Sequence, residues 1–409
     1  MLAFTFPGQG SQRPGMGRAW VEHPSWEVVT EASEAAGRDL ARLLLDAEPD
    51  ELTLTGNAQL ATFVLGLVVL DAIERVGVEP TLCAGHSLGE YTALVAAAAL
   101  AFEDGVHLVV ERGEAMHHAA KERPGTMAAV LGTSDDDAEA ACQRAEGDVW
   151  VANYNAPGQV VISGEPVAVE RASRIARELG ARKVMSFPVV GAFHTMLMSP
   201  ARARLRKALS DAPFTEAEVP VVANVDARPH SAPEDWPGLL SAQLCGPVRW
   251  RQSLETLARQ GATHVVEVGP GGVLTGLTRR TLPDATAVAV GSPDDLEKLL
   301  ETMSGSETWH SYAAAHQGEH LYTSERVVVS PTAGIFEPEP SLSVPGPGGL
   351  SGRTGPEIDL EVGAFLGRVG TTEVRTPFAG RLVGFLAHRG ERVMAAQPVA
   401  WLRVISDEA

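Results

Sequence analysis

Several residue types are scarce in this sequence, and each scarcity excludes a class of protein. The 409 residues include only three cysteines, Cys83, Cys142 and Cys245. Because an odd number of widely spaced thiols does not build a disulfide framework, we expect a reducing, cytoplasmic location. Basic residues number 33 against 52 acidic ones, which gives a formal net charge of −19. This charge argues against a nucleic-acid partner, since such binding depends on neutralising phosphates.

The sequence also has no long apolar run and no recognisable secretion signal. Its most apolar run, residues 93–102, has about half of the roughly 18 apolar residues that a membrane span requires. The first seven residues lack the basic flank and cleavage site of a signal peptide. Hydrophobic residues nevertheless make up 44% of the chain, enough for a sizeable core. We therefore expect a globular cytoplasmic protein without a membrane partner.

The spacing of apolar residues divides the chain into parts. Residues 1–303 alternate short apolar runs with helical patterns, which predicts an α/β fold with a hydrolase-like core and a parallel sheet. Within this part, about residues 124–187 follow the order β-α-β-β-α-β, typical of an inserted ferredoxin-like subdomain. Residues 304–324 lose the periodicity and are expected to form a linker. Its three histidines show no recognisable ligand spacing, so we expect no metal site.

After residue 325, turns and short strands replace the helical patterns, and one motif occurs twice. Residues 330–336 read SPTAGIF and residues 376–382 read TPFAGRL. Two copies of a strand–turn–strand unit predict a small, pseudo-symmetric, all-β domain over residues 325–409. A segment rich in Pro, Gly and Ser, residues 338–356, separates the two copies as a loop.

The strongest chemical signal is a G-x-S-x-G pentapeptide, residues 85–89, between a predicted strand and an Ala-rich predicted helix. In that context the pentapeptide predicts a nucleophile elbow, a turn so sharp that only small residues fit around the serine. The turn lifts the Ser87 hydroxyl clear of the sheet, at the positive end of a helix. The N–H of Leu88 then points to where an oxyanion would form. The alternative interpretation is a tight turn without catalytic function.

A serine nucleophile needs a base, and the sequence offers several histidines. His86 adjoins Ser87, but neighbouring residues across an elbow usually point apart, which favours a structural role for His86. His194 follows a strand-like run, in the loop GAFH over residues 191–194, where catalytic groups are often presented. From the residues alone, a catalytic and a structural role for His194 remain equally open. Packing or surface roles are favoured for the histidines on a helical pattern, His107, His117 and His118.

Six motifs together resemble the malonyl-CoA:acyl-carrier-protein transacylase family, which includes the acyltransferase domains of polyketide synthases. The resemblance covers about residues 1–300. In order, the motifs are FPGQGSQ (6–12), GHSLGE (85–90), VERG (110–113), NYNAPGQ (153–159), GAFH (191–194) and EVGPG (267–271).

The resemblance implies a catalytic role for four residues. Ser87 would attack the thioester carbonyl of malonyl-CoA while His194 takes its proton. The main-chain N–H groups of Gln9 and Leu88 would form the oxyanion hole. The family completes this Ser–His pair with a main-chain carbonyl on a later loop. We place that loop at residues 247–250, where Arg249 occupies a position often filled by glutamine.

The resemblance also implies a substrate-binding set. Arg112 would bind the malonyl carboxylate through its planar guanidinium, although without the resemblance a surface arginine in a helix would be the better interpretation. Phe193 would fill the space that an α-methyl branch requires, which favours malonyl over methylmalonyl. Gln59 and Asn155 would add polar contacts, with structural roles equally open for both.

The end of the chain resembles the biotinyl/lipoyl attachment domain, a barrel-sandwich of two similar halves. That family carries its prosthetic group on a lysine in a hairpin, which corresponds here to residues 366–372, LGRVGTT. The hairpin has no lysine, and the last lysine of the chain is Lys298. We therefore expect neither biotin nor lipoate, and no bound cofactor elsewhere.

These observations predict an acyl-carrier-protein S-malonyltransferase of fatty acid or polyketide biosynthesis, working through a malonyl ester on Ser87. Its partners would be malonyl-CoA and an acyl carrier protein, with a synthase or carboxylase subunit as a partner of the C-terminal domain. Two alternatives remain: a thioesterase that hydrolyses stalled acyl chains, and a scaffold protein with a vestigial transferase. Carrier proteins are usually acidic, so a local basic patch is expected to dock them, with candidates Arg182, Lys183, Arg279 and Arg280.

Overall fold

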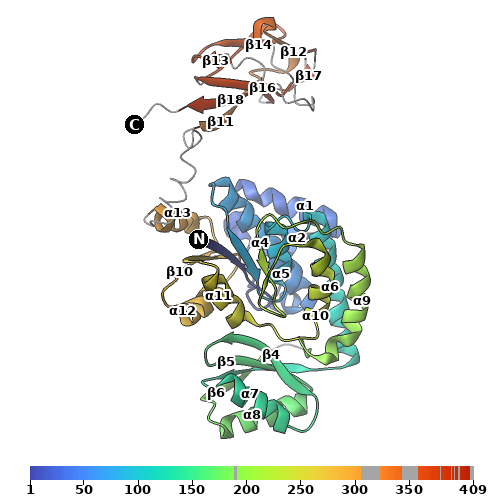
Figure 1. Ribbon diagram of the computed structural model, residues 1–409. Coiled ribbons are helices and arrows are strands. Elements are labelled where there is room, and N and C mark those ends of the chain that lie inside the picture. Colours follow the sequence, from blue (N-terminus) through green and yellow to red (C-terminus); the bar gives the residue numbers. More distant parts are fainter. Residues whose placement is uncertain are drawn as a thin grey trace. The chain divides into compact units, whose positions relative to one another are not determined.

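The computed structural model describes most of the chain, and Figure 1 shows its elements in order. The described residues are 1–187, 191–304, 323–342, 358–377, 379–387, 389–390, 392–394 and 397–405. The chain divides into two compact units, Met1–Met303 and Ser304–Ala409. The predicted linker with its three histidines, and the loop predicted over residues 338–356, lie largely outside the described residues.

A six-stranded sheet forms the centre of the first unit, in the order β10-β9-β1-β2-β7-β8. All neighbouring strands are parallel except β7 and β8. Every residue of the first strand, LAFTF, is buried, as expected for a parallel strand covered on both faces. The α/β class predicted from the sequence is therefore confirmed. The strands are β1 (Leu2–Phe6), β2 (Leu82–Gly85), β7 (Val221–Val222), β8 (Pro229–His230), β9 (His264–Val268) and β10 (Thr286–Val290).

Helices surround this sheet, and α4 is the most deeply buried of the long ones. By length and composition α4 could cross a membrane, which we did not predict from the sequence. Its apolar window is 89% buried inside the structure, as in a core helix. The α-helices of this part are α1 (Glu27–Ala36), α2 (Leu40–Leu45), α3 (Pro49–Thr53), α4 (Thr55–Arg75), α5 (Gly89–Ala96), α6 (Phe102–Glu122), α9 (Ser199–Asp211), α10 (Trp236–Gln243), α11 (Trp250–Arg259), α12 (Val273–Thr281) and α13 (Asp294–Ser304). The 3-10 helices are η1 (Arg18–Trp20), η2 (Pro24–Trp26), η3 (Met196–Met198) and η4 (Pro233–Asp235).

A smaller subdomain lies within the first unit, with the element order β3-α7-β4-β5-α8-β6. This is the order that the sequence predicts for residues 124–187. Its four strands form an antiparallel sheet, β4-β5-β3-β6. The elements are β3 (Thr126–Leu131), α7 (Asp135–Arg144), β4 (Val149–Ala156), β5 (Gln159–Gly164), α8 (Pro166–Glu178) and β6 (Lys183–Ser186).

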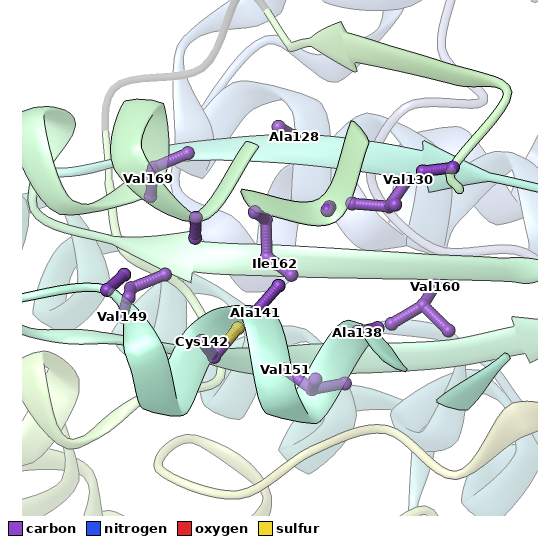
Figure 2. Packing of buried hydrophobic residues seen from close by; sticks show 14 of the residues in the cluster. Ala128, Val130, Ala138, Ala141, Cys142, Val149, Val151, Val160, Ile162 and Val169 are labelled. Atoms are coloured by element: carbon purple, nitrogen blue, oxygen red, sulfur yellow. The ribbon is translucent and has the colours of Figure 1, made fainter. Parts of the chain in front are cut away.

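The two faces of the subdomain sheet have different neighbours. Val160 and Ile162 of β5 belong to a buried cluster with Ala138 and Ala141 of α7, and Figure 2 shows these side chains packed together. Val161, between the two β5 residues, lines a cavity instead. Because successive residues of a strand point to opposite faces, one sheet provides both the subdomain core and a wall of the cavity.

The described residues of the second unit form two antiparallel four-stranded sheets, β11-β18-β16-β13 and β15-β14-β12-β17. The glycines of the repeated motif, Gly334 and Gly380, each begin a strand. Residues 366–372 span a hairpin in which Val369 pairs with Thr372. The elements are β11 (Thr323–Val329), β12 (Gly334–Pro338), η5 (Pro340–Leu342), β13 (Ile358–Leu360), β14 (Phe365–Val369), β15 (Thr372–Arg375), β16 (Gly380–Phe385), β17 (Arg392–Val393) and β18 (Pro398–Ile405).

Candidate active site

Ser87 stands at a sharp turn between β2 and α5. Its φ angle is 54°, a left-handed backbone conformation that is unusual for a residue other than glycine. A Cβ atom on Gly85 would lie 1.9 Å from the main chain of Gly89, and one on Gly89 would lie 2.0 Å from the oxygen of Phe6. The two glycines are therefore required by close backbone contacts. This geometry is the one that the pentapeptide predicts.

Asn224, just after β7, holds this turn. Its side-chain oxygen accepts the Ser87 N–H at 2.7 Å, and its amide nitrogen donates to the Gly85 oxygen at 2.6 Å. Asn224 is fully buried. This residue was not predicted from the sequence, because no local motif links it to Ser87, 137 positions earlier.

His194 lies directly against the serine, with 2.7 Å between its Nε2 atom and Ser87 Oγ. Its Nδ1 atom lies 2.8 Å from the main-chain oxygen of Gln243. Because a carbonyl only accepts hydrogen bonds, Nδ1 carries the proton and Nε2 is free to accept from the serine hydroxyl. Burial, and then the nearby charge of Arg112, lower the pKa of His194 to about 3. The imidazole is thus neutral at physiological pH and available as a base.

The carbonyl that supports His194 differs from the one predicted. We expected it on residues 247–250, but it belongs to Gln243, the last residue of α10. The final carbonyls of a helix have no partner inside the helix, so this oxygen is free to accept from a side chain. Arg249 instead donates its N–H to the Asn224 oxygen at 2.9 Å and its Nε to the Val225 oxygen at 3.0 Å.

The side chain of Gln243 contacts three further groups. Its Oε1 accepts from Arg112 Nη2 at 3.0 Å, and its Nε2 donates to the Ser87 oxygen at 2.8 Å and to a Glu90 carboxylate oxygen. Gln243 is fully buried. Its role was not predicted from the sequence, because a glutamine near the end of a helical pattern has no distinguishing motif around it.

Arg112 is 1% exposed, which excludes the surface interpretation. Its Nη1 donates to Gln59 Oε1 at 2.6 Å, and its Nη2 donates to Ser87 Oγ at 3.1 Å. The guanidinium lies 5.5 Å from the centre of the Tyr91 ring. None of the ion pairs in the described part of the chain involves Arg112, and its buried Nε has no partner there. Burial lowers the pKa of Arg112.

The acidic neighbours of Arg112 in the sequence have another partner. Glu111 and Glu114 lie on the outer side of α6, where both accept from Arg204 of α9 at 2.6 Å. The guanidinium of Arg112 therefore keeps donors available toward the serine. A buried cation with unused donors is suited to bind an anionic group of a ligand.

A cavity of about 480 Å³ opens beside these groups, between the main body and the subdomain. Phe193 lines it, held on one side by Gly191, where a Cβ atom would lie 2.5 Å from the phenyl ring.

Asn155 also lines this cavity, and its Oδ1 lies 2.9 Å from His86 Nε2. His86 packs edge-on against Trp250, with ring centres 5.4 Å apart. His86 thus has structural contacts and none with Ser87 in the described residues.

The main-chain donors predicted for an oxyanion lie on two adjacent loops. β1 and β2 pair in parallel with Phe6 opposite Gly85, which brings Gln9 beside the elbow. Leu88 is the N-cap residue of α5. Within the described part of the chain, neither the Gln9 nor the Leu88 N–H has a hydrogen-bond acceptor. Gln59 is also brought to the site, with its Nε2 3.5 Å from Gln9 Oε1.

This geometry can be compared with known proteins. The family model of the acyl transferase domain matches residues 3–307. The malonyl CoA-acyl carrier protein transacylase of Bacillus subtilis is 41% identical over 310 residues, 74% of this chain and 97% of the relative. The Escherichia coli K12 protein of that name is 41% identical over 305 residues, 73% of this chain and 99% of the relative. The chain belongs to the malonyl CoA-acyl carrier protein transacylase family.

Solved structures of this transacylase family are also similar. The acyl-carrier-protein S-malonyltransferase of Burkholderia pseudomallei 1710b has a TM-score of 0.71 at 42% identity, covering 73% of this chain and 99% of that chain. A type II PKS malonyl-transacylase, solved in complex with its acyl-carrier protein, has a TM-score of 0.72 at 37% identity, covering 74% and 99%. The resemblance inferred for the first 300 residues is therefore confirmed. Residues 308–409 lie outside the match to the family model.

Proposed function

We propose that this protein transfers a malonyl group from malonyl-CoA to the phosphopantetheine thiol of an acyl carrier protein, in fatty acid or polyketide biosynthesis. The observation that carries the proposal is a Ser87–His194 pair beneath a buried Arg112 that has no carboxylate partner in the described residues. The family relationship supports the same reaction.

The first half-reaction acylates the serine. Ser87 Oγ attacks the thioester carbonyl carbon of malonyl-CoA, and its proton passes to His194 Nε2. The main-chain N–H groups of Gln9 and Leu88 stabilise the oxyanion, each by about 3–4 kcal/mol in well-studied hydrolases. The tetrahedral intermediate then breaks the carbon–sulfur bond, and the leaving thiolate of CoA takes the proton from His194. The products are malonyl-Ser87 and free CoA.

The second half-reaction returns the enzyme to its starting state. The phosphopantetheine thiol gives its proton to His194 Nε2 and attacks the ester carbonyl. The carbon–oxygen bond to Ser87 breaks, and Ser87 Oγ takes the proton back from His194. No oxidant, reductant, metal or bound cofactor enters either half-reaction.

Arg112 selects the acyl group by charge. One methylene separates the malonyl carboxylate from the reacting carbonyl, and Arg112 Nη2 lies 3.1 Å from Ser87 Oγ, so the carboxylate is within reach of the guanidinium. A neutral acyl group would leave this buried cation unpaired, a loss of about 3–5 kcal/mol. This preference also disfavours the editing-hydrolase alternative, which acts on uncharged acyl chains.

Phe193 and two amides refine the substrate site. The Phe193 ring would occupy the space of an α-methyl branch, which favours malonyl over methylmalonyl by about 1–3 kcal/mol. Gln59 orients Arg112 through the 2.6 Å contact to its Nη1. Asn155 faces the cavity while its Oδ1 holds His86. We assign both amides a positioning role beside the malonyl group.

The carrier protein would dock at the mouth of the cavity. Helix α12 lines the cavity through Val273, Leu274 and Leu277 and has two arginines in its last turn. The exposed basic residues proposed to contact the acidic carrier are Arg182, Lys183, Arg279 and Arg280. The acidic net charge of the whole chain makes such a local patch necessary for association.

The second unit is proposed to be an unmodified barrel-sandwich domain of the biotinyl/lipoyl type. Its two antiparallel sheets and the motif that twice leads into a strand support this assignment. The described hairpin β14–β15 has no lysine to modify. We propose that this unit docks a synthase or carboxylase subunit, and that the protein works in the cytoplasm.

Radiolabelled malonyl-CoA tests the transferase proposal. The wild-type protein should retain about one label per chain after rapid gel filtration and lose it when holo-acyl carrier protein is added. Ser87→Ala should retain none. Stoichiometric labelling of Ser87→Ala, or release of free malonate without transfer, would exclude the proposed reaction.

A further inference from the structure

Glu90 is a buried acid that the reaction described above does not use. It follows the elbow in α5 and is 1% exposed. One of its oxygens accepts from Gln243 Nε2, and the other accepts the Asn224 N–H at 3.3 Å. No cation in the described residues is paired with it directly.

The two partners of Glu90 are the residues that hold the catalytic groups. Gln243 contacts His194 through its main-chain oxygen and contacts Arg112 and Ser87 through its side chain. Asn224 holds the backbone of the elbow on both sides of His86. Glu90 is thus hydrogen-bonded to both residues that position Ser87, His194 and Arg112.

We propose that Glu90 is a positioning residue of the transfer reaction, which sets the orientation of the Gln243 amide and thereby the places of His194 and Arg112. Both carboxylate oxygens of Glu90 accept N–H groups, so Glu90 fixes the amide nitrogen of Gln243 toward itself and the amide oxygen toward Arg112. Without this constraint the side-chain amide of Gln243 can flip. The flip would place two hydrogen-bond donors, Gln243 Nε2 and Arg112 Nη2, opposite each other. This inference rests on the proposed function.

The charge of Glu90 has a second effect on the same site. A buried guanidinium needs a nearby negative charge, but a carboxylate in direct contact would occupy the donors that the substrate requires. Glu90 stabilises the charge of Arg112 from beyond Gln243, without such contact. Burial raises the pKa of Glu90, and the donors from Gln243 and Asn224 and the charge of Arg112 limit the rise, to about 7.

Glu90→Gln is a sharp test, because the two side chains have nearly the same shape. Both carboxylate oxygens of Glu90 accept hydrogen bonds, whereas an amide has one accepting oxygen, so Asn224 or Gln243 must lose a partner. Single-turnover acylation of Ser87 by malonyl-CoA and by acetyl-CoA, over a range of concentrations, separates the maximal rate from the half-saturating concentration.

We expect Glu90→Gln to lower the maximal acylation rate by malonyl-CoA about 100-fold, as a small misplacement of reacting groups does. We also expect the preference for malonyl-CoA over acetyl-CoA to fall about tenfold, because Arg112 loses its fixed place. Gln243→Met keeps the main-chain carbonyl but removes the amide. When Gln243→Met is already present, adding Glu90→Gln should lower the acylation rate by less than about threefold, because Glu90 acts through the amide of Gln243.

Glu267→Gln is the matched control. Glu267 is also 1% exposed and accepts two main-chain N–H groups, those of Gly272 and Thr275, at 3.1 and 2.7 Å. This variant should keep the wild-type preference for malonyl-CoA and a rate within about threefold, after correction for the folded fraction. A loss of acylation rate in Glu267→Gln equal to that in Glu90→Gln would overturn the inference. So would a double variant of Glu90 and Gln243 whose loss of rate is the product of the two single losses. A Glu90→Gln rate within twofold of wild type would overturn it as well.

If Glu90→Gln does not fold, Gln243→Met alone remains decisive. A wild-type rate and an unchanged malonyl preference in that variant would overturn the inference. Failure of the proposed function has a different signature, since the wild-type protein would then form no malonyl adduct at all.

Discussion

The Nδ1 atom of His194 lies 2.8 Å from the main-chain oxygen of Gln243, at the point where α10 ends. A helix terminus, with its unpaired carbonyls, takes the place that an aspartate holds in a catalytic triad. This partner has no net charge, so it fixes the tautomer of the imidazole, and its hydrogen bond raises the pKa of His194 without the charge that a carboxylate would add. Burial then dominates, and the pKa of His194 falls to about 3.

This lowered pKa predicts how stability depends on pH. The native state binds fewer protons than the unfolded state between pH 3 and 6.5, so the contribution of His194 is present above pH 6.5 and is lost as the pH falls toward 3. The free energy of unfolding of wild type minus that of His194→Asn should therefore increase from pH 4 to pH 6.5, by on the order of 3 kcal/mol.

Comparing the two proteins removes the effect of other groups that titrate in this range, including Glu90. Urea unfolding followed by circular dichroism at both pH values measures the difference. A difference that stays constant with pH would show that folding does not lower the pKa of His194.

Loss of the base should slow acylation far more than it weakens binding. Replacing His194 with Ala removes the proton acceptor 2.7 Å from Ser87 Oγ, so we expect the acylation rate to fall by about 10²- to 10⁴-fold. Rapid-quench measurement of the malonyl adduct checks this. His86→Ala is the comparison, since His86 contacts Asn155 and Trp250; an equal loss there would point to His86 as the base.

Arg112 should determine which acyl groups are accepted. Arg112→Ala should lower kcat/KM for malonyl-CoA by about 10²-fold or more and leave acetyl-CoA nearly unaffected, because only malonyl has a carboxylate to lose its partner. Arg204→Ala is a matched control, since it removes an arginine that binds Glu111 and Glu114 at the surface. Surface ion pairs contribute about 1 kcal/mol or less, so that variant should act like wild type. Equal losses with both CoA esters would refute the assignment.

Phe193 should set the tolerance for branched acyl groups. Phe193→Ser opens space in the cavity and should raise the ratio of kcat/KM for methylmalonyl-CoA to that for malonyl-CoA by about 10- to 100-fold. Competition between the two CoA esters, read by the intact mass of the acylated protein, measures this ratio directly. An unchanged ratio would show that the α-methyl group of methylmalonyl does not lie against Phe193.

Asn224 should matter for both folding and catalysis. Asn224→Ala leaves the Ser87 N–H and the Gly85 oxygen without partners in a buried place, which should lower the free energy of unfolding by about 2–4 kcal/mol. The folded fraction should also acylate more slowly, because the elbow is no longer held. Wild-type stability and rate in this variant would show that the turn is maintained by its glycines alone.

The groups that could be predicted from the sequence are those marked by short contiguous motifs. Ser87 has glycines on both sides that the backbone contacts require, and the order of strands and helices alone indicates the subdomain. The role of Arg112 was predicted only from the resemblance, since nothing in its local sequence distinguishes it from a surface arginine. The loop position of His194 left a catalytic and a structural role equally open until the resemblance was considered. The structure brings both to Ser87 and buries them.

The supporting residues were not predictable in the same way. Gln243 and Asn224 reach the site from 156 and 137 positions away and have no pattern around them. The carbonyl partner of His194 was misplaced by a few residues, because its position depends on where α10 ends and helix ends are poorly marked in sequence. Glu90 lies inside a recognised motif, yet its role becomes visible only once its partners are known.

The two-faced sheet of the subdomain separates what must be conserved for folding from what can vary for substrate choice. In β5, Val160 and Ile162 belong to the buried cluster with the helices α7 and α8, and Gln159 and Val161 line the cavity. Substitutions on the cavity face of the sheet can therefore change the wall of the cavity while the packing on the opposite face stays intact. The cavity-lining positions of this sheet are therefore sites at which acyl selectivity can be changed by mutation with little loss of stability.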